Sequence, residues 1–371
     1  MPRSKLFARF HATAVIGLCL AAAQPAAAVD YVEAPPLGEA IDPSVRDCRA
    51  TDTLNVPLIT WGADLATIHA NGGAAETQRG SLFDEAGLRV RLQRQDDFKA
   101  QVEAYLRCDS PFLRATMGMA GMVADLAQAD PRTEMVAIYQ LSWSNGGDAL
   151  VVDAGIARPE NLAGRTIALQ AYGPHVDYLM TVLGDAGLSA DDVTLRWTRD
   201  LVGFAGSAPA AALHDDQAVD AAMVIIPDAL ALTSGGAGGD GSEDSVRGAQ
   251  ILLSTRSASR VIADVYLVRA DYLAEHRDQV QAFVHALMQA EEETRALMRR
   301  PGRERDALLA AGGRILLDAA DAVADTEALW ADAETVGWTG NVRFFGEEGY
   351  ARGFARLVPA IQAQLVDIGL L

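Results

Sequence analysis

The chain has 371 residues, with 50 acidic residues against 31 Lys and Arg and a formal net charge of -19. Half of the residues are hydrophobic and only three are cysteine, which excludes collagen-like, disordered and disulfide-scaffold proteins. At roughly 150 residues per domain, the length predicts two domains, each able to bury a core of its own. Affinity for nucleic acids comes largely from Lys and Arg that neutralise phosphates, so the acidity excludes nucleic acid as a partner.

Residues 1–28 have the three regions of a secretory signal peptide. Arg3, Lys5 and Arg9 form a basic start, an apolar run follows at 12–23, and the Ala triplet 26–28 provides an A-x-A cleavage site. The apolar run is too short to span a bilayer, and no later stretch approaches the length of a membrane helix. We therefore predict an exported, soluble protein cleaved near Ala28, with an uncleaved anchor as the alternative.

Cleavage leaves two cysteines, Cys48 and Cys108, in a chain sent to an oxidising compartment. We predict that they form a disulfide bond, and the alternative is two unrelated buried thiols. Because the sequence has no Cys-x-x-Cys motif and no His/Cys cluster, we expect neither a metal site nor a cofactor.

After a Pro-rich and Ala-rich arm at 29–53, strands and helices alternate along the chain. Strands are predicted at 54–60, 88–92, 112–116, 135–141, 149–152, 166–170, 193–197, 221–226, 251–253 and 262–268. Helices separate most of them, and amphipathic helix dominates from residue 271 onward. This alternation predicts an α/β fold with mostly parallel sheets flanked by helices. The Gly-rich acidic segment 234–245 is expected to be a surface loop.

The strongest local signal is the turn at 171–175 between a strand and the helix predicted at 176–185. Gly173 can serve as the N-cap of that helix, and the proline after it fits the first helical position. Free N–H groups at such a helix start favour a small oxyanion, although an ordinary turn explains the pattern equally well. Tyr172 and His175 are not needed for the turn, so we expect them to face a ligand.

Open parallel sheets bind ligands at the carboxyl ends of their strands. Trp61 follows the first strand and can stack on an organic ligand or an ammonium group. Asp64 either contacts a ligand or caps the next helix. The corresponding positions at the ends of two other strands are Thr116, Met117, Gly118, Pro227 and Asp228.

The segment 142–148 joins two strands with no helix between them. Gly146 and Gly147 supply backbone freedom within it. We predict that this segment is a hinge, because such segments absorb the dihedral changes when two lobes close on a ligand.

Three segments carry a resemblance to a known family. They are GIARPENLAGRTIA at 155–168, AGLSADDV at 186–193 and VYLVRADYL at 265–273. They resemble motifs of the periplasmic solute-binding proteins of ABC importers, in the nitrate/sulfonate/taurine branch that includes binders of thiamine-pyrimidine precursors. The resemblance covers residues 54–299. It implies a two-lobed periplasmic-binding-protein fold of type II and a monomer that delivers a small-molecule ligand to a membrane permease.

The resemblance also implies how the chain is divided and where the ligand lies. Lobe one would comprise 54–145 and 258–371, and lobe two 146–257. Carried over by position, the ligand-binding residues would be Trp61, Thr116, Met117, Gly118, Ser142, Trp143, Ser144, Asn145, Tyr172, Gly173, His175, Pro227 and Asp228.

The acids Asp64, Asp148 and Asp228 would repel a purely anionic ligand from this cleft. We therefore expect a zwitterion or an amine with a polar tail, either taurine-like or nitrogen-containing. Two other functions stay open. One is a ligand sensor that docks on a receptor. The other is a thiamine-pyrimidine biosynthetic enzyme of the same fold, although the Cys-rich motif of such enzymes is absent here.

Overall fold

The fold is described from a computed structural model that covers residues 29–49, 51–204, 206–258 and 260–371. The predicted signal peptide, residues 1–28, lies outside the described residues. Within the described part of the chain, no helix is both long and apolar enough to cross a membrane.

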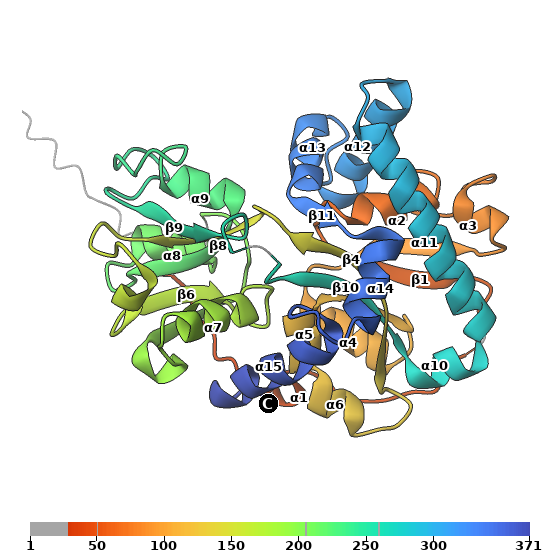
Figure 1. Ribbon diagram of the computed structural model, residues 1–371, viewed down its shortest axis with the longest axis horizontal. Coiled ribbons are helices and arrows are strands. Elements are labelled where there is room, and N and C mark those ends of the chain that lie inside the picture. The colour runs from red at the N-terminus through yellow and green to blue at the C-terminus, as the bar shows by residue number, and fades with distance from the viewer. Residues whose placement is uncertain (1–28, 50, 205, 259) are drawn as a thin grey trace, which may run out of the picture.

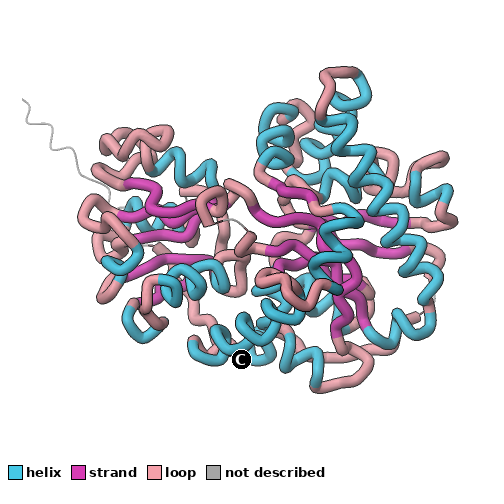
Figure 2. The backbone as a smooth tube through the Cα atoms, viewed as in Figure 1, coloured by secondary structure: helices cyan, strands magenta, loops and turns pink. Residues whose placement is uncertain are grey.

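The strands form two groups that lie side by side (Figure 2). Lobe one, on the right in Figure 1, contains a two-stranded sheet and a four-stranded sheet, and lobe two contains a five-stranded sheet. The lobe-one strands are β1 (Leu54–Leu58), β2 (Val90–Arg94), β3 (Phe112–Thr116), β4 (Met135–Ser144), β10 (Ala263–Arg269) and β11 (Ala333–Thr335). The lobe-two strands are β5 (Asp148–Val152), β6 (Thr166–Gln170), β7 (Thr194–Thr198), β8 (Ala221–Ile225) and β9 (Gln250–Ser254).

Helices cover both lobes (Figure 1). Lobe one carries α2 (Asp64–Ala70), α3 (Leu82–Glu85), α4 (Phe98–Leu106), α5 (Met117–Met122), α6 (Ala124–Gln128), α10 (Ala270–Glu275), α11 (Arg277–Met298), α12 (Arg303–Leu316), α13 (Val323–Ala331) and α14 (Gly337–Gly346). Lobe two carries α7 (Val176–Asp185), α8 (Pro209–Asp215) and α9 (Ile226–Leu232). Two further helices, α1 (Leu37–Ala40) and α15 (Phe354–Asp367), lie near the chain ends.

The strand pairing is mixed, which corrects the prediction of mostly parallel sheets. Parallel pairs are β1 with β2, and β6 with both β7 and β8. In contrast, β10 is antiparallel to β3 and β4, and β5 is antiparallel to β8 and β9. The reason lies in the connections between lobes. A strand that enters a sheet directly from the other lobe, without a crossover helix, is free to pair in the antiparallel sense.

The chain passes between the lobes at 145–147, after β4, and again at 255–262, after β9. The predicted hinge residues Gly146 and Gly147 lie in the first of these crossovers, and Gly146 has a φ of 116°, in the region that favours glycine. Every strand of the five-stranded sheet falls between residues 148 and 254. The numbered limits of the two lobes stay a prediction.

The N-terminal arm contacts both lobes. At its start, the Val32 N–H donates to the Trp197 carbonyl at 2.9 Å, beside the edge strand β7. Further along, Arg46 N–H donates to the Leu106 carbonyl at 3.1 Å, and a disulfide joins Cys48 to Cys108 in lobe one. The predicted disulfide is therefore confirmed, and it anchors the arm covalently.

One apolar core extends through both lobes. It includes Leu113 and Val265 from lobe one, Leu150 and Leu179 from lobe two, and Leu365 of α15. The helix α15 packs against α5 of lobe one and α7 of lobe two, and lies below and between the two groups of strands in Figure 1. The lobes thus meet through apolar contacts on this side of the molecule.

Removing the disulfide by the double substitution C48A/C108A should lower the free energy of unfolding. The bond spans 60 residues of sequence, and a closed loop of that size contributes about 4 kcal/mol in the chain-entropy model. Urea unfolding followed by circular dichroism measures the difference. Wild-type protein kept in reductant should unfold at the same urea concentration as the double variant, and an unchanged midpoint in both would contradict the prediction.

Candidate functional site

Buried polar side chains gather where the two lobes meet and where the chain crosses between them. From lobe one they come from α2, β3, β4 and β10, and from lobe two they come from β5 and the first turn of α7. Most side chains in such positions are apolar, so a cluster of this kind marks a candidate binding site.

Arg114 is the centre of the lobe-one part. It lies in the middle of β3 with no exposed surface, and its guanidinium donates to both carboxylate oxygens of Asp64, with Nη2 to Oδ2 at 2.8 Å. Its Nη1 donates to Asp264 Oδ1 at 2.9 Å. Although burial opposes it, the charges of the two carboxylates raise the pKa of Arg114 above its ordinary value. Burial in turn raises the pKa of both carboxyl groups, that of Asp64 to about 7, against the opposing charge of Arg114. A permanent cation is therefore held between two buried carboxyl groups.

A polar path leads from this ion cluster to the first crossover. Ser142 Oγ donates to Asp264 Oδ2 at 3.1 Å and accepts from the Trp61 indole N–H at 2.9 Å. The Trp61 ring lies against Gly147, where an added Cβ would be 2.7 Å from the ring. Trp61 therefore links lobe one to the predicted hinge.

A second network lies on the lobe-two side. Asp148 accepts from Ser144 Oγ at 2.5 Å and bonds the His175 ring through Nε2 at 2.7 Å. Thr255 Oγ1, in the second crossover, lies 2.8 Å from Ser144 Oγ and accepts from the Gly146 N–H at 2.9 Å. These bonds join the two crossovers to each other.

Asp177, in the first turn of α7, is buried at the contact between the lobes. Its carboxylate lies against Gly118 of α5, where an added Cβ would be 2.1 Å from Oδ1. Among the described residues, no hydrogen-bond partner reaches Asp177 Oδ1, His175 Nδ1 or the Tyr178 hydroxyl. Burial raises the pKa of Asp177 to about 7, against the opposing effect of the N–H groups of Asp177 and Tyr178.

Asp228 lies near this group, at the start of α9. It accepts from the Gly203 N–H at 3.0 Å and follows the exposed Pro227. Burial raises the pKa of Asp228, while the Gly203 N–H and the charge of His175 act in the opposite direction. Asp228 therefore adds a further carboxylate to the lobe-two side.

Two predicted site residues face elsewhere. Trp143 alternates with Ser142 and Ser144 along β4, so it points to the opposite face, where its ring packs edge-on to Phe344 at 5.8 Å in the core. Tyr172 is buried and donates from its hydroxyl to the Pro35 carbonyl at 2.7 Å, so it holds the N-terminal arm.

Several other predicted residues have local structural roles. His175, and not Gly173, is the N-cap residue of α7, because the turn extends two residues further than expected. Thr116 caps α5 by accepting from the Met119 N–H at 3.1 Å, and Met117 is part of the apolar core. The Asn145 N–H donates to the Asp332 carbonyl at 2.8 Å.

Sequence reasoning missed Arg114, Asp264, Asp177 and Thr255. The available signal was a single charge inside an apolar strand, since Arg114 stands within Phe112–Thr116 and Asp264 within the apolar run before Val268. A charge in such a position requires a buried partner. Asp64 was expected to cap a helix or contact a ligand, and its main bond is instead to Arg114.

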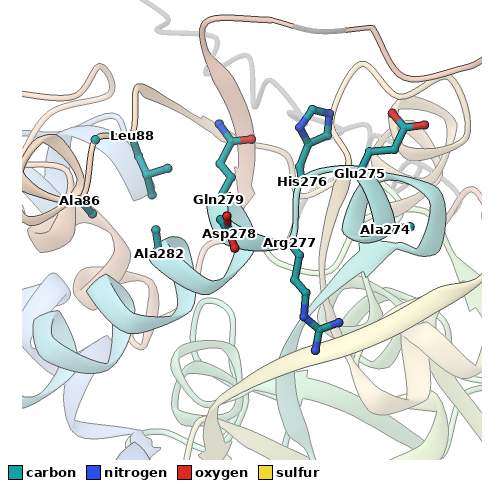
Figure 3. A pocket seen from close by; sticks show the side chains of 10 residues that line it. Ala86, Leu88, Ala274, Glu275, His276, Arg277, Asp278, Gln279 and Ala282 are labelled. Atoms are coloured by element: carbon teal, nitrogen blue, oxygen red, sulfur yellow. The ribbon is translucent and has the colours of Figure 1, made fainter.

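The surface hollows of the described residues include two of a size that suits a small molecule. One, of about 580 Å³, lies at the junction of α10 and α11, where Leu88 and Ala282 face each other across it (Figure 3), and no predicted site residue lines it. The other, of about 430 Å³, is lined by lobe-two residues that include Tyr178 and by Val261 and Arg352. Only the second hollow touches the α7 turn described above.

The substitution R114M should lower the free energy of unfolding by about 3 to 5 kcal/mol, because it leaves Asp64 and Asp264 buried without a cation. The matched control is R91M on strand β2 of the two-stranded sheet, because the ion pair of Arg91 with Glu76 is exposed and is worth at most about 1 kcal/mol. Urea midpoints of the two variants provide the comparison. Equal losses in R114M and R91M would contradict this account of the buried cluster.

The raised pKa of Asp177 predicts a dependence of stability on pH. A carboxyl whose pKa is about 7 when folded and 3.8 when unfolded binds an extra proton in the folded state, so stability is highest below pH 4 for this group and is lost as pH rises towards 7. The contribution of one such proton is about 1.4 kcal/mol per pH unit.

Buried Asp64, whose pKa burial also raises to about 7, contributes a slope of its own over this pH range. The substitution D177N should therefore remove only the Asp177 part of the slope of unfolding free energy against pH. The control D185N, at an exposed position of the same helix, should retain it. Parallel curves for wild type and D177N between pH 4 and 7 would show that Asp177 titrates normally.

Comparison with known proteins identifies the fold and the family. Comparison with curated protein sequences found no match. The aliphatic sulphonate binding protein SsuA from Escherichia coli superposes with a TM-score of 0.59 at 15% identity, over 87% of this chain and 89% of that one. The Candida albicans CA3427 gene product, described as having the generic periplasmic binding protein fold, gives 0.53 at 12% identity over 85% and 95%.

The desulfurization enzyme DSZB gives a TM-score of 0.50 at 16% identity, over 86% of this chain and 93% of that one. At these identities the likeness establishes the fold, and the predicted periplasmic-binding-protein fold is confirmed. Residues 74–297, more than half of the chain, match the sequence profile of the family described as NMT1/THI5 like. The chain therefore belongs to the NMT1/THI5-like family.

Proposed function

We propose that the protein is the solute-binding component of a periplasmic ABC import system. It captures a small polar organic solute between its lobes and delivers it to a permease in the inner membrane. The observation that carries this proposal is the set of buried polar atoms without partners at the α7 turn, His175 Nδ1, Asp177 Oδ1 and the Tyr178 hydroxyl, within the described residues. Buried polar atoms need partners, and a polar ligand between the lobes supplies them.

The crossovers support the same proposal. Two segments connect the lobes, and Gly146 in the first of them has the backbone freedom that a hinge requires. A binding protein that closes on its ligand uses such a pair of connections. SsuA, which shares the fold, binds aliphatic sulphonates.

An enzyme has the same fold, so the fold does not separate binding from catalysis. The contacts at the site favour binding. A Ser-His-Asp arrangement needs the histidine between the serine and the acid. Here Ser144 and His175 both bond Asp148, and both cysteines in the described ranges belong to the disulfide. Neither the Ser144, His175 and Asp148 group nor the two cysteines provide an activated nucleophile.

Isothermal titration of the purified protein with taurine, ethanesulfonate, nitrate and 4-aminopyrimidine tests the proposal. We expect one of these probes to bind with a 1:1 stoichiometry and to reduce the radius of gyration in X-ray scattering, because the lobes close around it. Binding without any change in chemical composition of the probe, checked by chromatography, separates capture from catalysis. Heat from none of the probes would count against the proposal.

Trp61 provides a site-directed check. The substitution W61A removes the indole that joins Ser142 to Gly147, and it should lower the affinity for the bound probe at least tenfold while the circular dichroism spectrum is retained. The control is W338A, at an exposed tryptophan on α14 of lobe one. Equal affinities in W61A and W338A would show that Trp61 lies outside the site.

A further inference from the structure

The charges buried between the lobes do not balance. The described carboxylates of this region are those of Asp64, Asp148, Asp177, Asp228 and Asp264, all less than a tenth exposed. The guanidinium of Arg114 is occupied by Asp64 and Asp264, and the ring of His175 is bonded to Asp148. Asp177 has no cationic partner in the ranges that the structure covers.

Asp177 also occupies a special position. It lies in the first turn of a ten-residue helix, is 3% exposed, and its Oδ1 is directed at Gly118 of the opposite lobe. The residues around it, His175 and Tyr178, each have a buried polar atom without a partner in the part of the chain described here. The unpartnered atoms thus belong to one turn, and the carboxylate of Asp177 touches the opposite lobe.

The charges at this turn favour a ligand with a positive charge. An ionised carboxylate buried without a partner is costly, whereas a cationic donor placed beside it forms a strong charge-assisted hydrogen bond. A helix N-terminus ordinarily attracts anions. Here the carboxylate of Asp177 lies in that first turn and repels anions. The helix dipole of α7 therefore does not provide a binding site for a sulfonate or a nitrate.

Space for a small molecule is present next to this turn. The hollow of about 430 Å³ lined by Tyr178, Thr181 and Val261 reaches both lobes and falls within the range of small-molecule sites. Of the three residues with unpartnered atoms, Tyr178 lines this hollow, and the buried Asp177 and His175 are reached only when the lobes separate. Burial, together with the charge of Asp148, raises the pKa of the Tyr178 hydroxyl, which keeps that hydroxyl a neutral donor.

We propose that Asp177 is the residue that binds the cationic nitrogen of the ligand, and that it makes the protein selective for solutes carrying such a nitrogen over anions that lack one. His175 Nδ1 and the Tyr178 hydroxyl contact polar groups of the same solute. This inference rests on the proposed function, since it names the solute class that the site between the lobes accepts.

Two pairs of probes test the selectivity at pH 7.5 by isothermal titration. Each pair differs only in the amino group: taurine against ethanesulfonate, and 4-aminopyridine against pyridine. At least one amino compound should bind at least tenfold more tightly than its partner. The substitution D177N should reduce that ratio to about one. The control D191N, at an exposed lobe-two position that lines neither hollow, should leave the ratio unchanged.

The ratio of affinities within each probe pair is measured on the wild-type protein, so it does not require that a variant folds. Circular dichroism checks that D177N is folded. If at least one probe binds but neither amino compound binds more tightly than its partner, the inference is overturned and the proposed function is left intact. A preference for the amino compound that persists in D177N overturns the role of Asp177. Absence of binding by all probes overturns the proposed function, and the inference with it.

Discussion

The ion pairs of Arg114 fix the lobe-one half of the site. A buried guanidinium without partners would cost several kcal/mol, so Arg114 holds Asp64 at the start of α2 and Asp264 at the start of β10 in fixed positions. Asp264 in turn orients Ser142, which accepts the Trp61 indole N–H, and the indole packs on Gly147. One buried cation therefore positions a series of side chains that ends at the connection between the lobes.

The period of a β-strand joins this half of the site to the other. Ser142 and Ser144 are two residues apart in β4 and so project from the same face. Ser142 belongs to the network of Arg114, and Ser144 donates to Asp148, which also bonds His175. A shift of β4 by one residue would replace both serines and bring Trp143 to this face. The register of one strand thus sets the geometry on both sides of the site.

The sequence was sufficient for the elements and insufficient for the contacts between them. Strands such as 112–116 and 166–170 agree with the structure residue for residue, because their apolar runs are bounded by clear turn residues. Pairing direction was wrong for β5 and β10, since it depends on where a strand enters a sheet. Tyr172 was wrongly expected to face a ligand, because its partner, the Pro35 carbonyl, is distant in sequence. Arg114 was missed for the same reason: a charge in an apolar strand shows that a partner exists and not which residue it is.

Two opposing effects act where α5 meets α7. The apolar core shared by the lobes, with Leu179 and Leu365 on this side, favours contact between them, because separating them exposes apolar surface at about 25 cal/mol per Å². The carboxylate of Asp177 acts against that contact, because closure places it against Gly118 and away from water. The N-terminal arm is bonded to both lobes and limits how far they separate. Neutralising Asp177 therefore removes the electrostatic opposition to closure at this contact. A cation bound there would make the contact between the lobes depend on the ligand as well as on apolar packing.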